Sequence, residues 1–229
     1  MTLYADKMLA SFPEGLKIPD ALVAFFHWLD TQNLYRDFDG DGGSGGARAL
    51  IDAARDNYLL YAAPVNMEDA KSWTQSDDPA VYNRLAPFFR LGGNGTHAAL
   101  WRDDAGETQI VILGSGSTGV LTANAVDFLR LIAIGYEEYS FPDQYDLTPM
   151  EIYEEEYGDG DAEEYEEDYG EPKPAPPAPP HALRDWVCRT FDTTIPDRAS
   201  DIVGEVADMD ADTSTDPFWI WEHSLDKWK

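Results

Sequence analysis

Residues 109–135 read QIVILGSGSTGVLTANAVDFLRLIAIG, and this stretch decides the fold. Its first five residues are mostly branched and apolar and are followed by a glycine, which is typical of a short buried strand. Asn124 followed three residues later by Asp127 is similar to a capping box, and Gly135 lies where helices commonly stop. The stretch therefore predicts a strand, a glycine-rich turn and a helix in succession.

Further elements are predicted on both sides of this stretch. Residues 98–101 are expected to pair with 109–113 as a hairpin across the turn at 103–106. A helix is expected after Pro19, with one apolar side made of Leu22, Phe25, Phe26 and Leu29. A second helix is expected after Asp78 and Pro79, with Val81, Leu85 and Phe88 or Phe89 on one side. Two more are expected near the C-terminal end, one with Leu183, Trp186, Val187 and Phe191 on one side and one carrying Trp219, Trp221 and Trp228.

The composition indicates a folded and strongly acidic protein. The 229 residues include 44 Asp plus Glu against 16 Lys plus Arg, a formal net charge of −28. Repulsion from polyanions excludes nucleic acid or anionic membrane binding as the main activity. Hydrophobic residues make up 43% and aromatic residues 13%, so a buried core is expected.

The negative charge is concentrated in one segment. Residues 151–171 hold 12 acidic residues, no basic residue and four tyrosines, which leaves a net charge of −16 elsewhere. A Pro-rich stretch follows from Pro172 to Pro180, and proline opposes both helix and central strand. We therefore expect a domain core at 1–150, a disordered, flexible acidic and Pro-rich insertion at 151–180, and a helical segment at 181–229 that packs on the core.

The cysteine count, the absence of signal and membrane-spanning patterns and the scattered histidines predict a cytoplasmic protein without a cofactor. Cys188 is the single cysteine, so no intrachain disulfide and no zinc cluster are expected. The first 15 residues lack the pattern of a secretory signal, and no apolar run is long enough to span a membrane. The four histidines, His27, His97, His181 and His223, lie in different predicted elements, and nothing places a base against a nucleophile. We expect no catalytic residue, no metal and no enzyme activity.

Two local motifs are weak. Residues 37–42 match the first half of a calcium loop, but Arg48 stands where the loop needs a bidentate glutamate, so a glycine-rich surface turn is expected. Residues 114–119 are similar to a phosphate-binding turn, but the lysine of such loops is missing. A structural turn is expected there.

The segment from Phe88 to Gly135 resembles the core of the SUKH superfamily, which includes yeast cell-wall-synthesis regulators and many bacterial immunity proteins. The resemblance rests on FFRLGGNG at 88–95, on ALW at 99–101, on IVILGS at 110–115 and on VLTANAVDFLRLIAIG at 120–135. It implies an α+β fold in which helices flank a mainly antiparallel sheet. It also implies a binding role, because bacterial members commonly neutralise a cognate toxin by direct contact.

The charge and the resemblance together suggest an immunity protein that neutralises a basic bacterial toxin, for example a nuclease. The alternative is a non-enzymatic scaffold or regulatory adaptor of the same fold. The oligomeric state, the identity of the toxin and the binding surface stay open. The expected partner contacts are Glu154, Glu155, Glu156, Tyr157, Glu163, Glu164, Tyr165, Glu166, Glu167 and Asp168.

Overall fold

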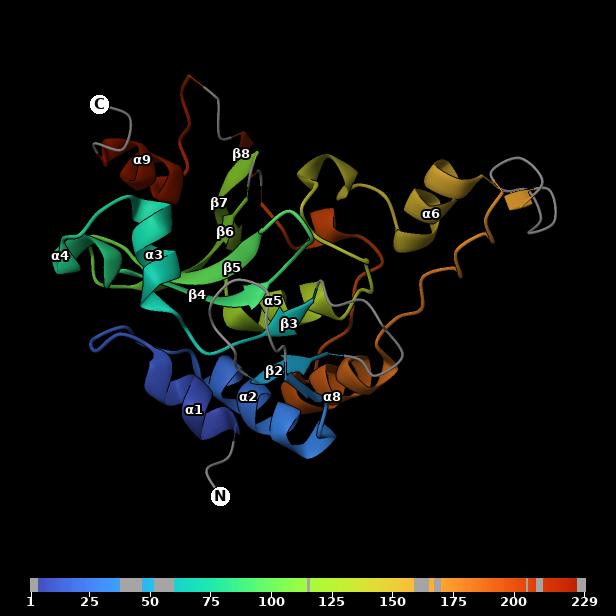
Figure 1. The fold of residues 1–229 in the computed structure, drawn as a ribbon, viewed down its shortest axis with the longest axis horizontal. Coiled ribbons are helices and arrows are strands. Elements are labelled where there is room, and N and C mark those ends of the chain that lie inside the picture. Colours follow the sequence, from blue (N-terminus) through green and yellow to red (C-terminus); the bar gives the residue numbers. More distant parts are fainter. Residues whose placement is uncertain are drawn as a thin grey trace.

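The fold is built on one antiparallel sheet whose strands follow each other in chain order (Figure 1). The computed structural model describes residues 4–37, 47–51, 60–114, 116–158, 165–166, 170–204, 206–208 and 212–225. Within these residues the strands are β1 (Tyr35–Asp37), β2 (Ala47–Leu50), β3 (Tyr61–Ala62), β4 (Leu85–Arg90), β5 (His97–Arg102), β6 (Thr108–Leu113), β7 (Ser117–Thr122) and β8 (Ala207–Asp208). The longer helices are α1 (Tyr4–Ser11), α2 (Asp20–Gln32), α3 (Met67–Thr74), α5 (Ala125–Ile132), α6 (Pro149–Tyr157), α8 (His181–Phe191) and α9 (Pro217–Ser224). The short helix α4 spans Pro79–Tyr82, and 3-10 turns span Pro142–Gln144 and Ala199–Asp201.

Helices cover both faces of the sheet because its central strands are apolar on both sides. In β5, Ala98 and Leu100 belong to a core with α1, α2, α5 and α8, whereas Ala99 and Trp101 belong to a core with α3 and α9. This alternation follows from the two-residue period of a strand. Figure 1 shows α1, α2 and α8 on one side of the sheet and α3, α4 and α9 on the other. The expected α+β single domain with a mainly antiparallel sheet is confirmed.

A bulge in β4 concentrates aromatic rings in the larger core. The pairing of β4 with β5 shifts register between Pro87 and Phe89, so that Phe88 and Phe89 both join the core that includes α2 and α5. The ring of Phe128 on α5 lies 5.5 Å from that of Phe88 and 5.6 Å from that of Phe89, both edge-on. This cluster joins the sheet to its helices.

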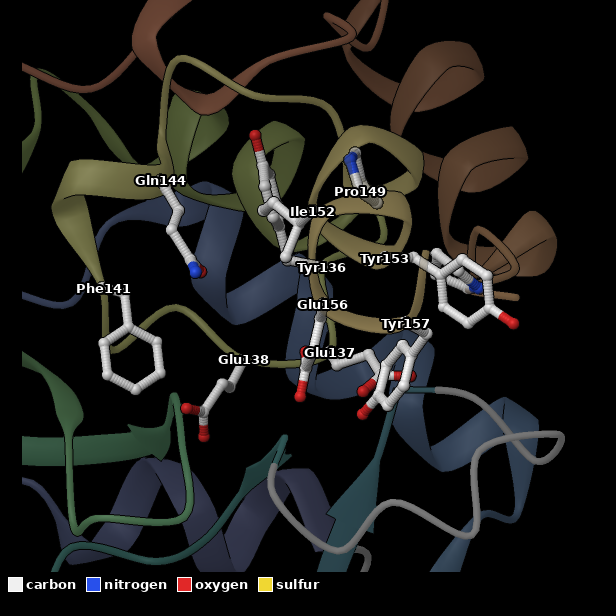
Figure 2. A pocket seen from close by; sticks show the side chains of 11 residues that line it. Tyr136, Glu137, Glu138, Phe141, Gln144, Pro149, Ile152, Tyr153, Glu156 and Tyr157 are labelled. Atoms are coloured by element: carbon white, nitrogen blue, oxygen red, sulfur yellow. The ribbon is translucent and has the colours of Figure 1, made fainter. Parts of the chain in front are cut away.

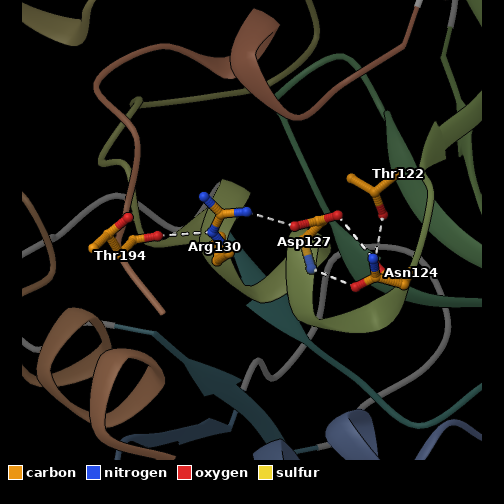
Figure 3. Close-up of polar contacts among 5 residues, drawn as sticks. All are labelled: Thr122, Asn124, Asp127, Arg130 and Thr194. Carbon is orange, nitrogen blue, oxygen red and sulfur yellow. Dashed lines mark hydrogen bonds and ion pairs between the residues drawn. The ribbon is translucent and has the colours of Figure 1, made fainter. Parts of the chain in front are cut away.

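Helix α5 begins as the sequence predicts and is tied to the chain after α8. The Asn124 side chain accepts a hydrogen bond from the Asp127 backbone N–H at 3.0 Å and donates one to the Asp127 carboxylate at 2.8 Å. Figure 3 shows this cap together with Arg130, which forms an ion pair with Asp127 at 2.7 Å and donates to the Thr194 carbonyl at 2.7 Å. The cap and the ion pair therefore stabilise the start of α5, and the hydrogen bond from Arg130 to Thr194 ties α5 to the segment that follows α8.

Several expected elements are confirmed. The hairpin of 98–101 with 109–113 corresponds to β5 and β6, which pair from His97 with Leu113 to Arg102 with Thr108. The expected helices after Pro19, after Asp78 and around Leu183 correspond to α2, α4 and α8. The last helix is α9, and Trp228 lies outside the described residues.

Two local expectations are wrong. The helix after Asp78 ends at Tyr82, and residues 85–90 form β4, because this apolar run gains more by pairing with β5 than a helix of four residues could gain by extension. A further strand, β7, separates the glycine turn from α5, so the turn connects two strands. Gly119 has φ +153° in β7, where Asp216 approaches to accept a hydrogen bond from the Val120 N–H at 2.8 Å.

The expected flexible insertion also needs correction at its start. Helix α6 crosses the predicted boundary at residue 150, because Thr148 and Glu151 form a capping box and Pro149 occupies the first turn. Residues 170–180 are also described and contact α6. Residues 159–164 and 167–169 lie outside the described residues.

The aromatic cluster predicts a large difference between two phenylalanine substitutions. Phe128→Ala removes a fully buried ring (0% exposed), and we expect the free energy of unfolding to fall by about 3–5 kcal/mol. The control Phe141→Ala removes a ring that is 45% exposed, and we expect a loss below about 1 kcal/mol. Urea unfolding of both variants gives the comparison, and equal losses would show that the cluster does not hold the core.

Candidate functional site

A pocket of about 350 Å³ lies between the segment that follows α5 and helix α6. Its apolar lining consists of Tyr136, Phe141, Pro149, Ile152, Tyr153, Tyr157 and Pro177, and its polar lining of Glu137, Glu138, Gln144 and Glu156. Figure 2 shows the three carboxylates in the region between the rings of Phe141 and Tyr157. Among the described residues that line the pocket, none is basic. The pocket therefore combines aromatic surface with concentrated negative charge.

Hydrogen bonds of buried tyrosines hold the segment between α5 and α6, which contributes Tyr136 to the pocket. The Tyr136 hydroxyl donates to the Leu147 carbonyl at 2.6 Å and accepts from the Ala199 N–H at 2.9 Å. The Tyr145 hydroxyl donates to the Tyr139 carbonyl at 2.8 Å. Burial raises the pKa of Tyr136 and of Tyr145, so both hydroxyls stay protonated and can donate these hydrogen bonds. The chain between α5 and α6 is thereby held in one conformation.

One acidic wall is anchored to the turn between β4 and β5. The Glu138 carboxylate accepts a hydrogen bond from the Gly93 N–H at 2.8 Å, and the Ser140 hydroxyl donates to the Asn94 side chain at 2.9 Å. A Cβ atom at Gly92 would collide with the Ser140 hydroxyl, so the close approach requires glycine at that position. These contacts position Glu138 without neutralising its charge.

The opposite wall is α6, which is fixed at its first turn. The Thr148 hydroxyl accepts from the Glu151 N–H at 3.2 Å, and the Glu151 carboxylate accepts from the Thr148 N–H at 2.7 Å. Hydrogen bonds of the Glu151 carboxylate to the backbone and side chain of Thr148, together with an ion pair to Arg198 at 3.0 Å, lower the pKa of Glu151. Ile152 packs against the main core. Helix α6 therefore presents its acidic residues from a fixed position.

The Pro-rich segment crosses α6 and contributes Pro177 to the pocket. The Tyr153 hydroxyl donates to the Pro174 carbonyl at 2.6 Å. The Lys173 ammonium donates to the Gly158 carbonyl at 2.9 Å and lies 5.5 Å from the centre of the Tyr153 ring. An aromatic ring of this wall thus already has a cation of the same chain over its face.

The expected partner contacts are only partly placed. Glu154, Glu155 and Glu156 are exposed on α6, and Tyr157 is half-buried beside them. Tyr165 and Glu166 are described, and the ring of Tyr165 lies 6.1 Å from that of Tyr157. Of the expected contacts that the structure describes, only Glu156 and Tyr157 line the pocket. Four further expected contacts lie outside the described residues: Glu163, Glu164, Glu167 and Asp168.

The sequence analysis did not find the pocket residues that follow α5. Tyr136, Glu137, Glu138 and Phe141 come directly after α5 and carry the same mixture of tyrosine and glutamate as α6. That shared composition is a signal that could have found them. Their meeting with α6 depends on contacts between residues far apart in the chain, which composition alone does not give.

The pKa of Tyr157 reflects the burial and the negative charge of its surroundings in the pocket. Partial burial, a hydrogen bond to Glu156 and the negative charges of Glu156 and Glu137 raise the pKa of Tyr157 to about 12. Burial contributes most to this shift, whereas the part that comes from the negative charges of Glu156 and Glu137 favours a cation at the same place. The arrangement can therefore bind a positively charged group that also offers an apolar surface to the rings.

The other motifs do not form a second site within the described residues. The histidines lie on four separate elements, α2, β5, α8 and α9. Among the described residues, no group of three or more His, Cys, Asp or Glu side chains could hold a metal ion. Residues 38–46 of the calcium-like segment lie outside the described residues, and Arg48 stacks on the Tyr61 ring at 4.6 Å.

The pocket predicts an abnormal titration of Tyr157. Spectrophotometric titration of the wild type minus Tyr157→Phe is expected to show one phenol that ionises near pH 12 instead of 10. Glu156→Gln removes a negative charge and a carboxylate acceptor, so the pKa of Tyr157 is expected to fall toward 10. Glu155→Gln, which changes an exposed residue outside the pocket lining, is expected to leave it unchanged. Equal effects of the two substitutions would contradict this description of the pocket.

The raised pKa of Tyr157 also determines how its contribution to the free energy of unfolding changes with pH. The neutral form of Tyr157 is favoured in the folded chain, so its contribution is fully present below pH 10 and is lost as the pH rises from 10 through 12.

Comparison with known proteins gives no relative for this chain. No protein-family model, no curated protein and no solved structure matches it. No helix of the described part of the chain has both the length and the apolar character needed to cross a membrane. Fold and pocket are therefore the basis on which a function is proposed.

Proposed function

We propose that this chain is a cytoplasmic immunity protein that binds a cognate basic toxin, such as a nuclease, and neutralises it by covering its active cleft. The observation that carries the proposal is the pocket, in which Glu137, Glu138 and Glu156 surround aromatic rings without a basic residue among the described lining. The net charge of −28 and the resemblance to the SUKH superfamily support the same function. A protein that presents acid and aromatic surface together is suited to a basic protein partner.

Charge and aromatic surface have different roles in this proposal. The long-range negative field speeds the encounter with a positive cleft and selects against acidic proteins. The rings of Phe141 and Tyr157 supply contact area of the kind that dominates binding energy in interfaces. Glu154 and Glu155 are exposed on the same helix as Glu156, so they extend the acidic surface beyond the pocket.

The alternative function is a scaffold or regulatory adaptor of the same fold. The Pro-rich segment favours it, because Pro174, Ala175 and Pro176 are exposed in an extended stretch. Such stretches are recognised by aromatic grooves of adaptor domains. A pull-down would then recover signalling or metabolic proteins, and substitutions on α6 would not affect their binding.

Co-expression tests the proposed function directly. The product of the neighbouring gene is expected to be toxic when expressed alone, to be harmless with this chain and to copurify with it one to one. A product that is harmless alone, or that stays toxic in the presence of this chain, would contradict the immunity function.

The acidic surface predicts a local effect on association with that partner. The double substitution Glu154→Gln and Glu156→Gln is expected to lower the association rate by roughly threefold or more at low ionic strength and to weaken its salt dependence. The control carries Glu14→Gln and Glu107→Gln, which change the net charge equally at exposed positions between α1 and α2 and between β5 and β6. Stopped-flow or surface-based kinetics measure both variants. Equal losses would assign the effect to net charge alone.

A further inference from the structure

The shape of the pocket limits what it can hold. Its volume of about 350 Å³ is at the small end of ligand pockets, and its lining comes from the segment after α5, from α6 and from Pro177. It can take one side chain of a partner, but no helix or strand. The ligand is therefore a single protruding group.

The lining also defines the chemistry of that group. The carboxylates of Glu137, Glu138 and Glu156 come from two different segments, and Figure 2 shows them in the same region as the rings of Phe141 and Tyr157. Both Glu137 and Glu156 act on the Tyr157 hydroxyl, so their fields overlap there. A ligand that satisfies this lining is cationic, offers several donors in different directions and has a flat surface to lay on a ring.

The chain itself contains a related interaction between a cation and an aromatic ring of the pocket lining. The Lys173 ammonium lies 5.5 Å from the centre of the Tyr153 ring, at the end of the pocket wall. Lysine is a compact charge with three donors, whereas arginine has a planar guanidinium with five donors that pairs with carboxylates and stacks on rings. Several carboxylates together with aromatic rings favour arginine.

We propose that this pocket receives an arginine side chain of the partner protein, with the guanidinium among Glu137, Glu138 and Glu156 and its plane against an aromatic ring of the lining. The arginine stem lies along the apolar lining. This inference deepens the proposed function, since the arginine belongs to the basic partner. It can be tested without that partner, so the two can fail separately.

The test uses three blocked tripeptides, Gly-Arg-Gly, Gly-Lys-Gly and Gly-citrulline-Gly, titrated into the isotopically labelled full-length chain. The arginine peptide is expected to bind with a dissociation constant on the order of millimolar and to shift NMR signals of residues that line the pocket. The lysine peptide is expected to bind at least about threefold more weakly. Citrulline keeps the shape of arginine but lacks its charge, and no binding is expected.

Two matched substitutions locate the site. Glu156→Gln is expected to weaken arginine binding roughly tenfold, the size of effect when a charge-assisted hydrogen bond is lost. Glu155→Gln removes an equal charge one residue away, outside the pocket lining, and is expected to change binding less than about twofold. Both residues are exposed, so both variants are expected to keep the amide spectrum of the wild type.

Four results would overturn the proposal: no shifts at the pocket, equal affinity for arginine and lysine, binding of citrulline, or equal weakening by the two substitutions. If the arginine peptide binds as described while the neighbouring product is not neutralised, the arginine site stands and the immunity function fails. If neutralisation occurs without arginine binding, the function stands and the arginine site fails.

Discussion

The packing of aromatic rings between β4 and helices α2 and α5 is the interaction on which the rest of the structure depends. The bulge between Pro87 and Phe89 turns two successive phenylalanines, Phe88 and Phe89, into one core, and Phe128 of α5 packs edge-on against both rings. Ring contacts of this kind add to the energy of simple burial. Because α5 is held by this packing, the segment that follows it begins at a defined position.

The segment that follows α5 forms one wall of the pocket, and hydrogen bonds donated by its tyrosines hold it in place. Tyr136 and Tyr145 are buried against backbone carbonyls, so the segment is rigid although it lacks long helices or strands. The same segment carries Glu137 and Glu138, which cannot be buried and so face the space next to α6. A structural need, the burial of tyrosines, thus places charged groups where a ligand can reach them.

The sequence predicted the elements that depend on local pattern and not those that depend on distant contacts. The β5–β6 hairpin, α2 and α8 follow from periodicity and turns, and the Asn124 cap follows from spacing. The apolar run of β4 fits either period and so predicts part of a helix, and the glycine in β7 weakens its strand pattern, so that strand is not predicted. Of the residues that line the pocket, the sequence singled out Glu156 and Tyr157, as expected partner contacts. The opposite wall depends on Glu138 meeting the β4–β5 turn, which no local pattern encodes.

We propose that the acidic aromatic pocket is where a basic protein partner binds. Backbone hydrogen exchange, measured on the free chain and on its complex with the proposed partner, tests this proposal most directly. We expect slower exchange in the complex at residues 136–144 and 149–158, which form the two walls of the pocket. Slower exchange confined to the opposite face of the sheet, at α3 and α9, would contradict it.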